Sequence, residues 1–137
     1  MDTPTASDYQ ALANFRHTLK KFLEFSTSAA QAAGVPPQQH QALLAIKGLR
    51  PDETMTVGLL AEKLLIAPHT AVELTNRLAK GGYITRQPDP EDRRRQTLHL
   101  TDQAEEVMSH LSAIHLKEIR ELAPQLIEIL SDLQGQR

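Results

Sequence analysis

The sequence contains no cysteine and no tryptophan, and aromatic residues make up only 4% of its 137 positions. The absence of cysteine excludes disulfides, thiolate zinc sites and any thiol-based redox switch. With so few aromatic rings, the core has to be aliphatic, built mainly from Leu, Ile and Ala. No stretch approaches the roughly 18–20 apolar residues of a membrane-spanning helix. We therefore expect a globular protein of cytoplasmic location without a membrane partner.

Basic residues are unevenly distributed along the chain. The net charge of −2 by itself argues against a nucleic-acid partner. Residues 1–55 carry five basic and five acidic side chains, residues 56–100 carry seven and five, and residues 101–137 carry three and seven. Positive charge is thus concentrated in the middle third of the chain. It is densest at Arg93-Arg94-Arg95.

Two helices are predicted before residue 50. Met1–Ser7 lacks the basic start and apolar run of a signal peptide, and we expect it to be a flexible tail. Apolar residues then recur at helical spacing over 8–33, and Gly34 is a natural stop. This helix is long for a small domain, so its apolar stripe is expected to be covered by a partner subunit. Pro36 and Pro37 suit the first turn of a second helix.

Two shorter helices are predicted next. Thr56 is expected to cap a helix over Val57–Leu65, with its hydroxyl accepting from an otherwise unpaired amide. After a tight turn, Pro68 opens a helix that runs to about Lys80 and is closed by Gly81-Gly82. Ala67 is a poor N-cap residue, so the predicted start of this helix rests on Pro68.

A β-hairpin and two further helices complete the prediction. Tyr83–Gln87 is β-prone, residues 88–92 are rich in turn formers, and apolar and polar residues alternate in Thr97–Leu100. Thr101 is expected to cap another long helix. Ala123-Pro124 is predicted to interrupt it, which leaves a last short helix to about Leu133. The expected fold class is mainly α (α+β), with six helices and a two-stranded hairpin.

A short helix, a tight turn, a second helix and a hairpin form, in this order, a winged helix-turn-helix, here over residues 55–100. Ala71, Leu74 and Leu78 would pack inward, and the opposite helix face would enter the major groove of DNA. Arginines at the hairpin tip suit the neighbouring backbone or minor groove. The residues predicted to contact double-stranded DNA are Thr56, Pro68, His69, Thr70, Glu73, Arg77, Arg86, Arg93, Arg94 and Arg95.

At these positions the sequence resembles the MarR family of transcription regulators. The resemblance is strongest in Tyr83–Arg86, in Asp89–Arg95 with its D-P-x-D-R-R tip, and in Leu98–Thr101. Weaker similarity extends over the two helices from residue 56 to 78 and over the helix that precedes them. Together these motifs are specific, although each alone is weak.

The resemblance implies a single domain over 8–137, with residues 8–50 and 101–137 as dimerisation helices and connector. Two such chains would form an intertwined homodimer and act as a repressor on a pseudo-palindromic operator. By position, Arg93 and Arg94 would approach the minor groove, and Asp92 would hold the wing through a carboxylate–arginine bridge. Glu73 departs from the small polar or basic residue of many relatives. It is expected to accept from a cytosine amino group or to pair with a nearby arginine.

A small-molecule effector is a further expectation from the resemblance, because members of the family often bind aromatic or phenolic acids. By position, Arg16, His17, His40 and Leu44, together with Phe15, are candidates to line such a cleft. For any single residue, the ordinary alternative is favoured. Phe15 and Leu44 would then belong to the core, and Arg16 and His17 to the surface.

Other functions are less favoured by the residues. A metal-responsive regulator would need converging histidines, but His110 and His115 are five apart on one helix and point to different sides. We predict neither a metal site nor a cofactor. No Gly-rich phosphate loop or Ser/His/Asp arrangement is present, so an enzyme is not expected. A winged helix that binds only proteins stays an alternative, although it leaves the three adjacent arginines unexplained.

Overall fold

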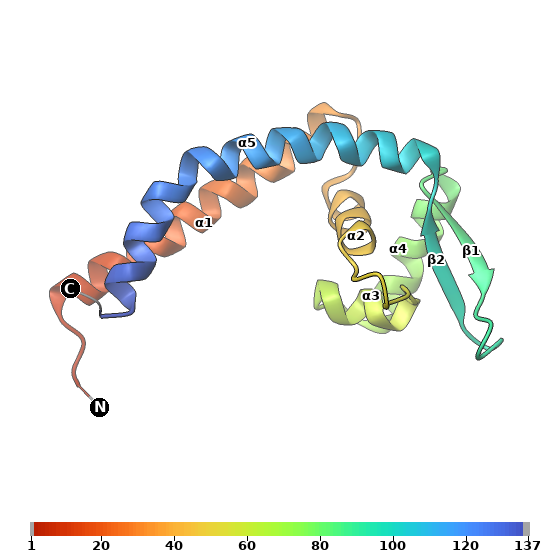
Figure 1. Cartoon of the computed structure of the whole chain (residues 1–137), viewed down its shortest axis with the longest axis horizontal. Coiled ribbons are helices and arrows are strands. Elements are labelled where there is room, and N and C mark those ends of the chain that lie inside the picture. Colours follow the sequence, from red (N-terminus) through yellow and green to blue (C-terminus); the bar gives the residue numbers. More distant parts are fainter. Residues whose placement is uncertain (1, 136–137) are drawn as a thin grey trace. The chain divides into compact units, whose positions relative to one another are not determined.

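The computed structural model describes residues 2–135, and in this range it contains five helices and one β-hairpin (Figure 1). Two compact units divide the chain. One consists of its two ends, up to residue 29 and from residue 112, and the other of residues 30–111. The first and last helices run through both units. No helix in the described range is long and apolar enough to cross a membrane.

The unit formed by the chain ends is built from α1 (Ala6–Ala32) and the later part of α5 (Asp102–Leu133). The helix α1 begins at Ala6, two residues before the predicted start, because Thr5 and Asp8 form a capping box. The Asp8 amide donates to Thr5 Oγ1 (3.2 Å), and the Thr5 amide donates to Asp8 Oδ2 (2.8 Å). The two residues before Asp8 that were expected in the tail are therefore helical.

The prediction of six helices is wrong, because α5 continues through Pro124 to Leu133. A proline inside a helix removes one backbone hydrogen bond, at a cost of roughly 3 kcal/mol. The apolar stripe formed by Leu122, Leu126 and Ile129 keeps helical spacing across the proline, and Ile129 is buried. A break at Pro124 would put this stripe out of phase, so continued packing favours one long helix.

The second unit contains α2 (Pro37–Lys47), α3 (Val57–Leu64), α4 (Pro68–Lys80) and the strands β1 (Ile84–Pro88) and β2 (Gln96–Leu100), together with the start of α5. The strands pair antiparallel, from Ile84 opposite Leu100 to Pro88 opposite Gln96. As predicted, the core is aliphatic. Its fully buried large side chains include Leu43, Met55, Leu60, Leu74, Leu78 and Met108.

The residues before α3 join the hairpin, which was not predicted. The Leu98 amide donates to the Met55 carbonyl (2.9 Å), and Thr56 forms a β-bridge with Thr97. Strand β2 thus has a neighbour on each side, β1 on one and the Met55–Thr56 segment on the other. This pairing holds the half of β2 that is nearer the hairpin tip against the segment that leads into α3.

Local capping sets the boundaries of the helices in this unit. Thr56 Oγ1 accepts from the Leu59 amide (3.2 Å), and Thr101 Oγ1 accepts from the Ala104 amide (3.2 Å), which confirms both predicted caps. Ala67 provides no side-chain cap, and α4 begins at Pro68. Between α3 and α4 the chain turns at Leu65, whose φ of 57° is left-handed. This residue ends α3 one position earlier than expected.

Replacing Pro124 by Ala tests whether α5 is continuous. Alanine restores the missing amide hydrogen within the helix, so we expect the free energy of unfolding to rise by about 1–3 kcal/mol in urea denaturation. Pro37→Ala is the matched control. Pro37 lies in the first turn of α2, where a proline removes no hydrogen bond from the helix. A neutral or destabilising Pro124→Ala change would contradict a continuous helix.

Candidate nucleic-acid interface

The helix α4 presents one apolar and one polar face. Ala71, Leu74 and Leu78 are buried against the core, as predicted, and the buried Thr75 hydroxyl donates to the Ala71 carbonyl (2.7 Å). The exposed face, called here the reading face, is formed by His69, Val72, Glu73, Asn76 and Arg77. This division follows from the 3.6-residue period of the helix.

The predicted DNA-contacting residues of this helix lie on or beside the reading face. Pro68, next to His69, is also exposed, and Thr70 is half-buried at its edge. In residues 2–135, Glu73 and Arg77 form no ion pair with each other or with any other residue. One of the two predictions for Glu73 was an ion pair with a nearby arginine, and this pair is not formed within the described part of the chain.

The wing consists of β1, β2 and the tip between them, residues 89–95. At the tip, the Arg94 side chain donates two hydrogen bonds to the Asp92 carboxylate, from Nε to Oδ1 (3.1 Å) and from Nη2 to Oδ2 (3.3 Å). The Arg94 amide also donates to Asp92 Oδ1 (3.1 Å). The predicted bridge from Asp92 to an arginine is present, and Arg94 is its main partner. The Arg94 side chain nevertheless stays 91% exposed.

A second acidic residue, Asp89, organises the tip and was not identified from the sequence. Its carboxylate lies 3.6 Å from Arg95 Nη2 and accepts from the Glu91 amide, and its own amide donates to the Arg95 carbonyl. Arg95 also lies within ion-pair distance of Asp92 (3.7 Å). Arg93 is exposed and has no ion pair or side-chain hydrogen bond to any residue between 2 and 135. The three adjacent arginines are thus not equivalent.

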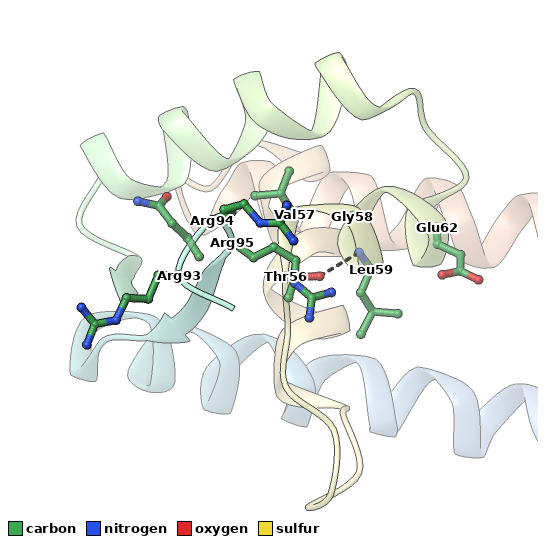
Figure 2. Close-up of a pocket in the computed structure, with 9 residues that line it drawn as sticks. Thr56, Val57, Gly58, Leu59, Glu62, Arg93, Arg94 and Arg95 are labelled. Atoms are coloured by element: carbon green, nitrogen blue, oxygen red, sulfur yellow. Dashed lines mark hydrogen bonds between the residues drawn. The ribbon is translucent and has the colours of Figure 1, made fainter. Parts of the chain in front are cut away.

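A pocket of about 700 Å³ lies between the wing tip and the start of α3 (Figure 2). Arg93, Arg94 and Arg95 line it from the tip, and the first turn of α3 lines it from the other side. In Figure 2 the Arg93 side chain extends away from the α3 residues. Two further lining residues, Gln96 and Glu62, were not singled out from the sequence. The predicted contact residue Thr56 lies in this pocket as the cap of α3.

The charges and hydrogen bonds of the wing tip shift the pKa of Asp92. The side-chain hydrogen bond from Arg94 is the largest of the effects that lower the pKa of Asp92 below its ordinary value of 3.8, followed by the backbone bond from Arg94 and the charge of Arg95. Partial burial of the Asp92 side chain raises the pKa and offsets part of this shift, by more than the charge of Arg95 lowers it. The carboxylate therefore stays ionised at neutral pH and pairs with the charges of Arg94 and Arg95.

The other predicted site residues are distributed over both units. Arg86 is exposed on β1. Of the candidates for an effector cleft, Arg16 and His17 are exposed on α1 in the first unit, whereas His40 and Leu44 lie on α2 in the second. His40 is buried, and Leu44 is half exposed, which contradicts the core position favoured for it. None of the four lines the pocket at the wing tip.

No group of three or more metal-ligating side chains converges anywhere in residues 2–135. In the chain-end unit, His115 instead shares a hydrogen bond with Ser26 (2.7 Å) and stands edge-on to Phe22 and Phe25. On β2, His99 shares a hydrogen bond with Thr97 (2.7 Å). These two histidines are therefore part of the packing of their elements.

Comparison with solved structures identifies the fold as that of winged-helix proteins. AbsC of Streptomyces coelicolor, a MarR family transcriptional regulator, matches with a TM-score of 0.71 at 18% identity, over 99% of this chain and 100% of its own. A mutant of MepR from Staphylococcus aureus, solved bound to an oligodeoxyribonucleotide, matches with a TM-score of 0.67 at 20% identity, over 93% and 94% of the two chains. At these identities the likeness shows the fold.

The sequence comparison points to the same family. Residues 33–95, which include the helix-turn-helix and the first part of the wing, match the model of the MarR family. The HTH-type transcriptional regulators YcgE and YkoM of Bacillus subtilis are similar at 35% and 25% identity over 59% and 77% of this chain. These matches span 51% of YcgE and 66% of YkoM.

The acid titration of Asp92 tests the structure of the wing tip. Because the pKa is lowered in the folded protein, the bridge to Arg94 contributes fully above pH 3.8 and is lost as the pH falls through the lowered pKa. We expect the side-chain carbon of Asp92 to titrate below pH 3.8 in an NMR experiment. In Arg94→Ala the midpoint should move back toward 3.8. An unshifted Asp92 in the unsubstituted protein would contradict the bridge.

Proposed function

We propose that this protein is a homodimeric transcription regulator that binds specific sequences in double-stranded DNA through α4 and the wing. The observation that carries the proposal is the polar reading face of α4, which lies in the same unit as an arginine-rich wing tip. A helix of this kind fits the major groove, and arginine suits the adjacent minor groove or backbone. The match of residues 33–95 to the model of the MarR family supports the same assignment.

The net charge of −2 is compatible with this proposal, because electrostatic attraction depends on local charge. The wing tip carries three arginines and three acidic residues. Asp89 and Asp92 pair with Arg95 and Arg94, and within residues 2–135 Arg93 is left without an acidic partner. Most acidic residues of the last third lie on α5, outside the reading face and the wing.

The proposed homodimer rests on apolar side chains left exposed in the chain-end unit. On α1, Tyr9 and Leu23 are each 62% exposed, and on α5 Ile127 is 64% exposed. Soluble monomers rarely expose this much apolar surface on neighbouring helices, and burial against a second copy would remove it from water. Two reading faces about 34 Å apart would then meet successive major grooves of a pseudo-palindromic site.

The proposal extends to repression at such an operator, relieved by a small aromatic or phenolic effector. Its support is the resemblance to the MarR family. A ligand that favours a different spacing between the two reading faces would weaken DNA binding by the ratio of its affinities for the two arrangements.

Replacing Arg93 by Ala tests the role of the wing in DNA binding. Arg93 has no ion pair or side-chain hydrogen bond within residues 2–135, so its loss should weaken DNA binding. The slope of log K against log salt should fall by about 0.9 for each lost phosphate contact, and thus by about 1.8 for the two wings of the dimer. Fluorescence anisotropy with a labelled duplex measures both quantities. Arg120→Ala, an exposed change on α5 in the other unit, should leave the slope unchanged. An unaltered slope in Arg93→Ala would count against the wing as a DNA contact.

The oligomeric state tests the proposed dimer. Light scattering at micromolar concentration should give twice the chain mass of 15.3 kDa. Leu23→Glu places a charge in the proposed interface and should shift the mass toward that of the monomer. Leu65→Glu is the matched control, because Leu65 is also apolar and is 91% exposed, but lies in the other unit. A monomeric mass for the unsubstituted protein would refute the dimer.

A further inference from the structure

Glu73 occupies the centre of the reading face. It lies four residues after His69 and three before Asn76, so these three side chains follow one line along the exposed side of α4. The buried Ala71 and Leu78 lie on the opposite side of the helix. Any surface that approaches the reading face therefore meets the Glu73 carboxylate near its middle.

No protein group within residues 2–135 neutralises this carboxylate. Arg77 lies four residues further along the helix, where an ion pair with Glu73 would be expected, but the two side chains are not paired. Neither side chain forms a hydrogen bond in the described range. Glu73 is thus free to interact with a ligand, and its negative charge is uncompensated.

A free carboxylate at this position is unfavourable for DNA binding in general, because the phosphates repel it. An ionised carboxylate can only accept hydrogen bonds. In the major groove the bases that offer amino donors are cytosine, at N4, and adenine, at N6, and the adenine donor stands beside the N7 acceptor, which would repel a carboxylate. Cytosine is therefore the base that best compensates Glu73.

We propose that Glu73 is a specificity-determining residue, which selects operators by accepting a hydrogen bond from a cytosine in each half-site and disfavours DNA without one. This inference rests on the proposed function, since it requires α4 to lie in the major groove. Discrimination has two sources. Cognate DNA gains a bond between a charged acceptor and an amino donor, and other DNA meets an unpaired carboxylate that has lost its water.

The experiment uses the full chain and synthetic duplexes. Preferred sequences are selected from a random duplex library with the unsubstituted protein, and each base pair of the selected half-site is then varied in binding titrations. We expect a C·G pair whose replacement weakens binding about tenfold or more. In Glu73→Gln, which retains the shape and loses the charge, discrimination at this pair should fall severalfold, and affinity for unrelated duplex should rise.

Glu106→Gln is the matched control, because it removes the same charge from an exposed position on α5, outside the reading face. Its base preferences should equal those of the unsubstituted protein. The inference is overturned if Glu73→Gln keeps the same preference at every base pair, or if the selected half-site has no preferred cytosine. Failure of the unsubstituted protein to select any sequence would instead overturn the proposed function, and the inference with it.

Discussion

The burial of one side of α4 is the constraint on which the rest of the structure depends. Ala71, Leu74 and Leu78 are fixed in the aliphatic core of the second unit, so the rotation of the helix about its own axis is set. The side chains on the other side are then exposed by geometry, whatever their chemistry. A shift of the apolar positions by one residue would turn Glu73 and Asn76 away from any bound DNA.

The wing depends on the same core through backbone pairing. The bond from the Leu98 amide to the Met55 carbonyl joins β2 to the segment before α3, and the buried Leu98 side chain packs into the core. At the tip, the carboxylates of Asp89 and Asp92 position arginine side chains through ion pairs. These carboxylates orient Arg95 and Arg94, and in the described part of the chain, residues 2–135, Arg93 has no protein partner. The tip carries three arginines and three acidic residues, so its exposed positive charge lies at Arg93 and in the outer parts of Arg94 and Arg95.

Features set by neighbours in the chain were predictable from the sequence, and features set by distant contacts were not. Thr56 and Thr101 were identified as caps because a cap requires only the following turn. The start of α4 at Pro68 was predicted because proline suits the first turn of a helix, which is also a local property. By contrast, the pairing of Met55 with Leu98 joins residues far apart in sequence, and no local pattern indicates it.

Pro124 shows the limit of local rules, because its intrinsic tendency to end a helix is outweighed by an apolar stripe that continues on both sides. For the candidate site, the sequence indicated the helix, its exposed face and the Asp92 bridge. It did not distinguish the three arginines, whose partners depend on how the tip folds. The role of Asp89 also follows from the folded tip. Its position in the D-P-x-D motif is the feature of the sequence that indicates this role.

Hydroxyl-radical footprinting on a duplex selected from a random library tests the central claim most directly, because it shows whether two reading faces meet one DNA site. The account predicts two protected patches on one face of the duplex, related by two-fold symmetry and centred about one helical turn, 10–10.5 base pairs, apart. Additional protection next to each patch should mark the wing. A selected pool without an enriched sequence and without protected patches would contradict the account.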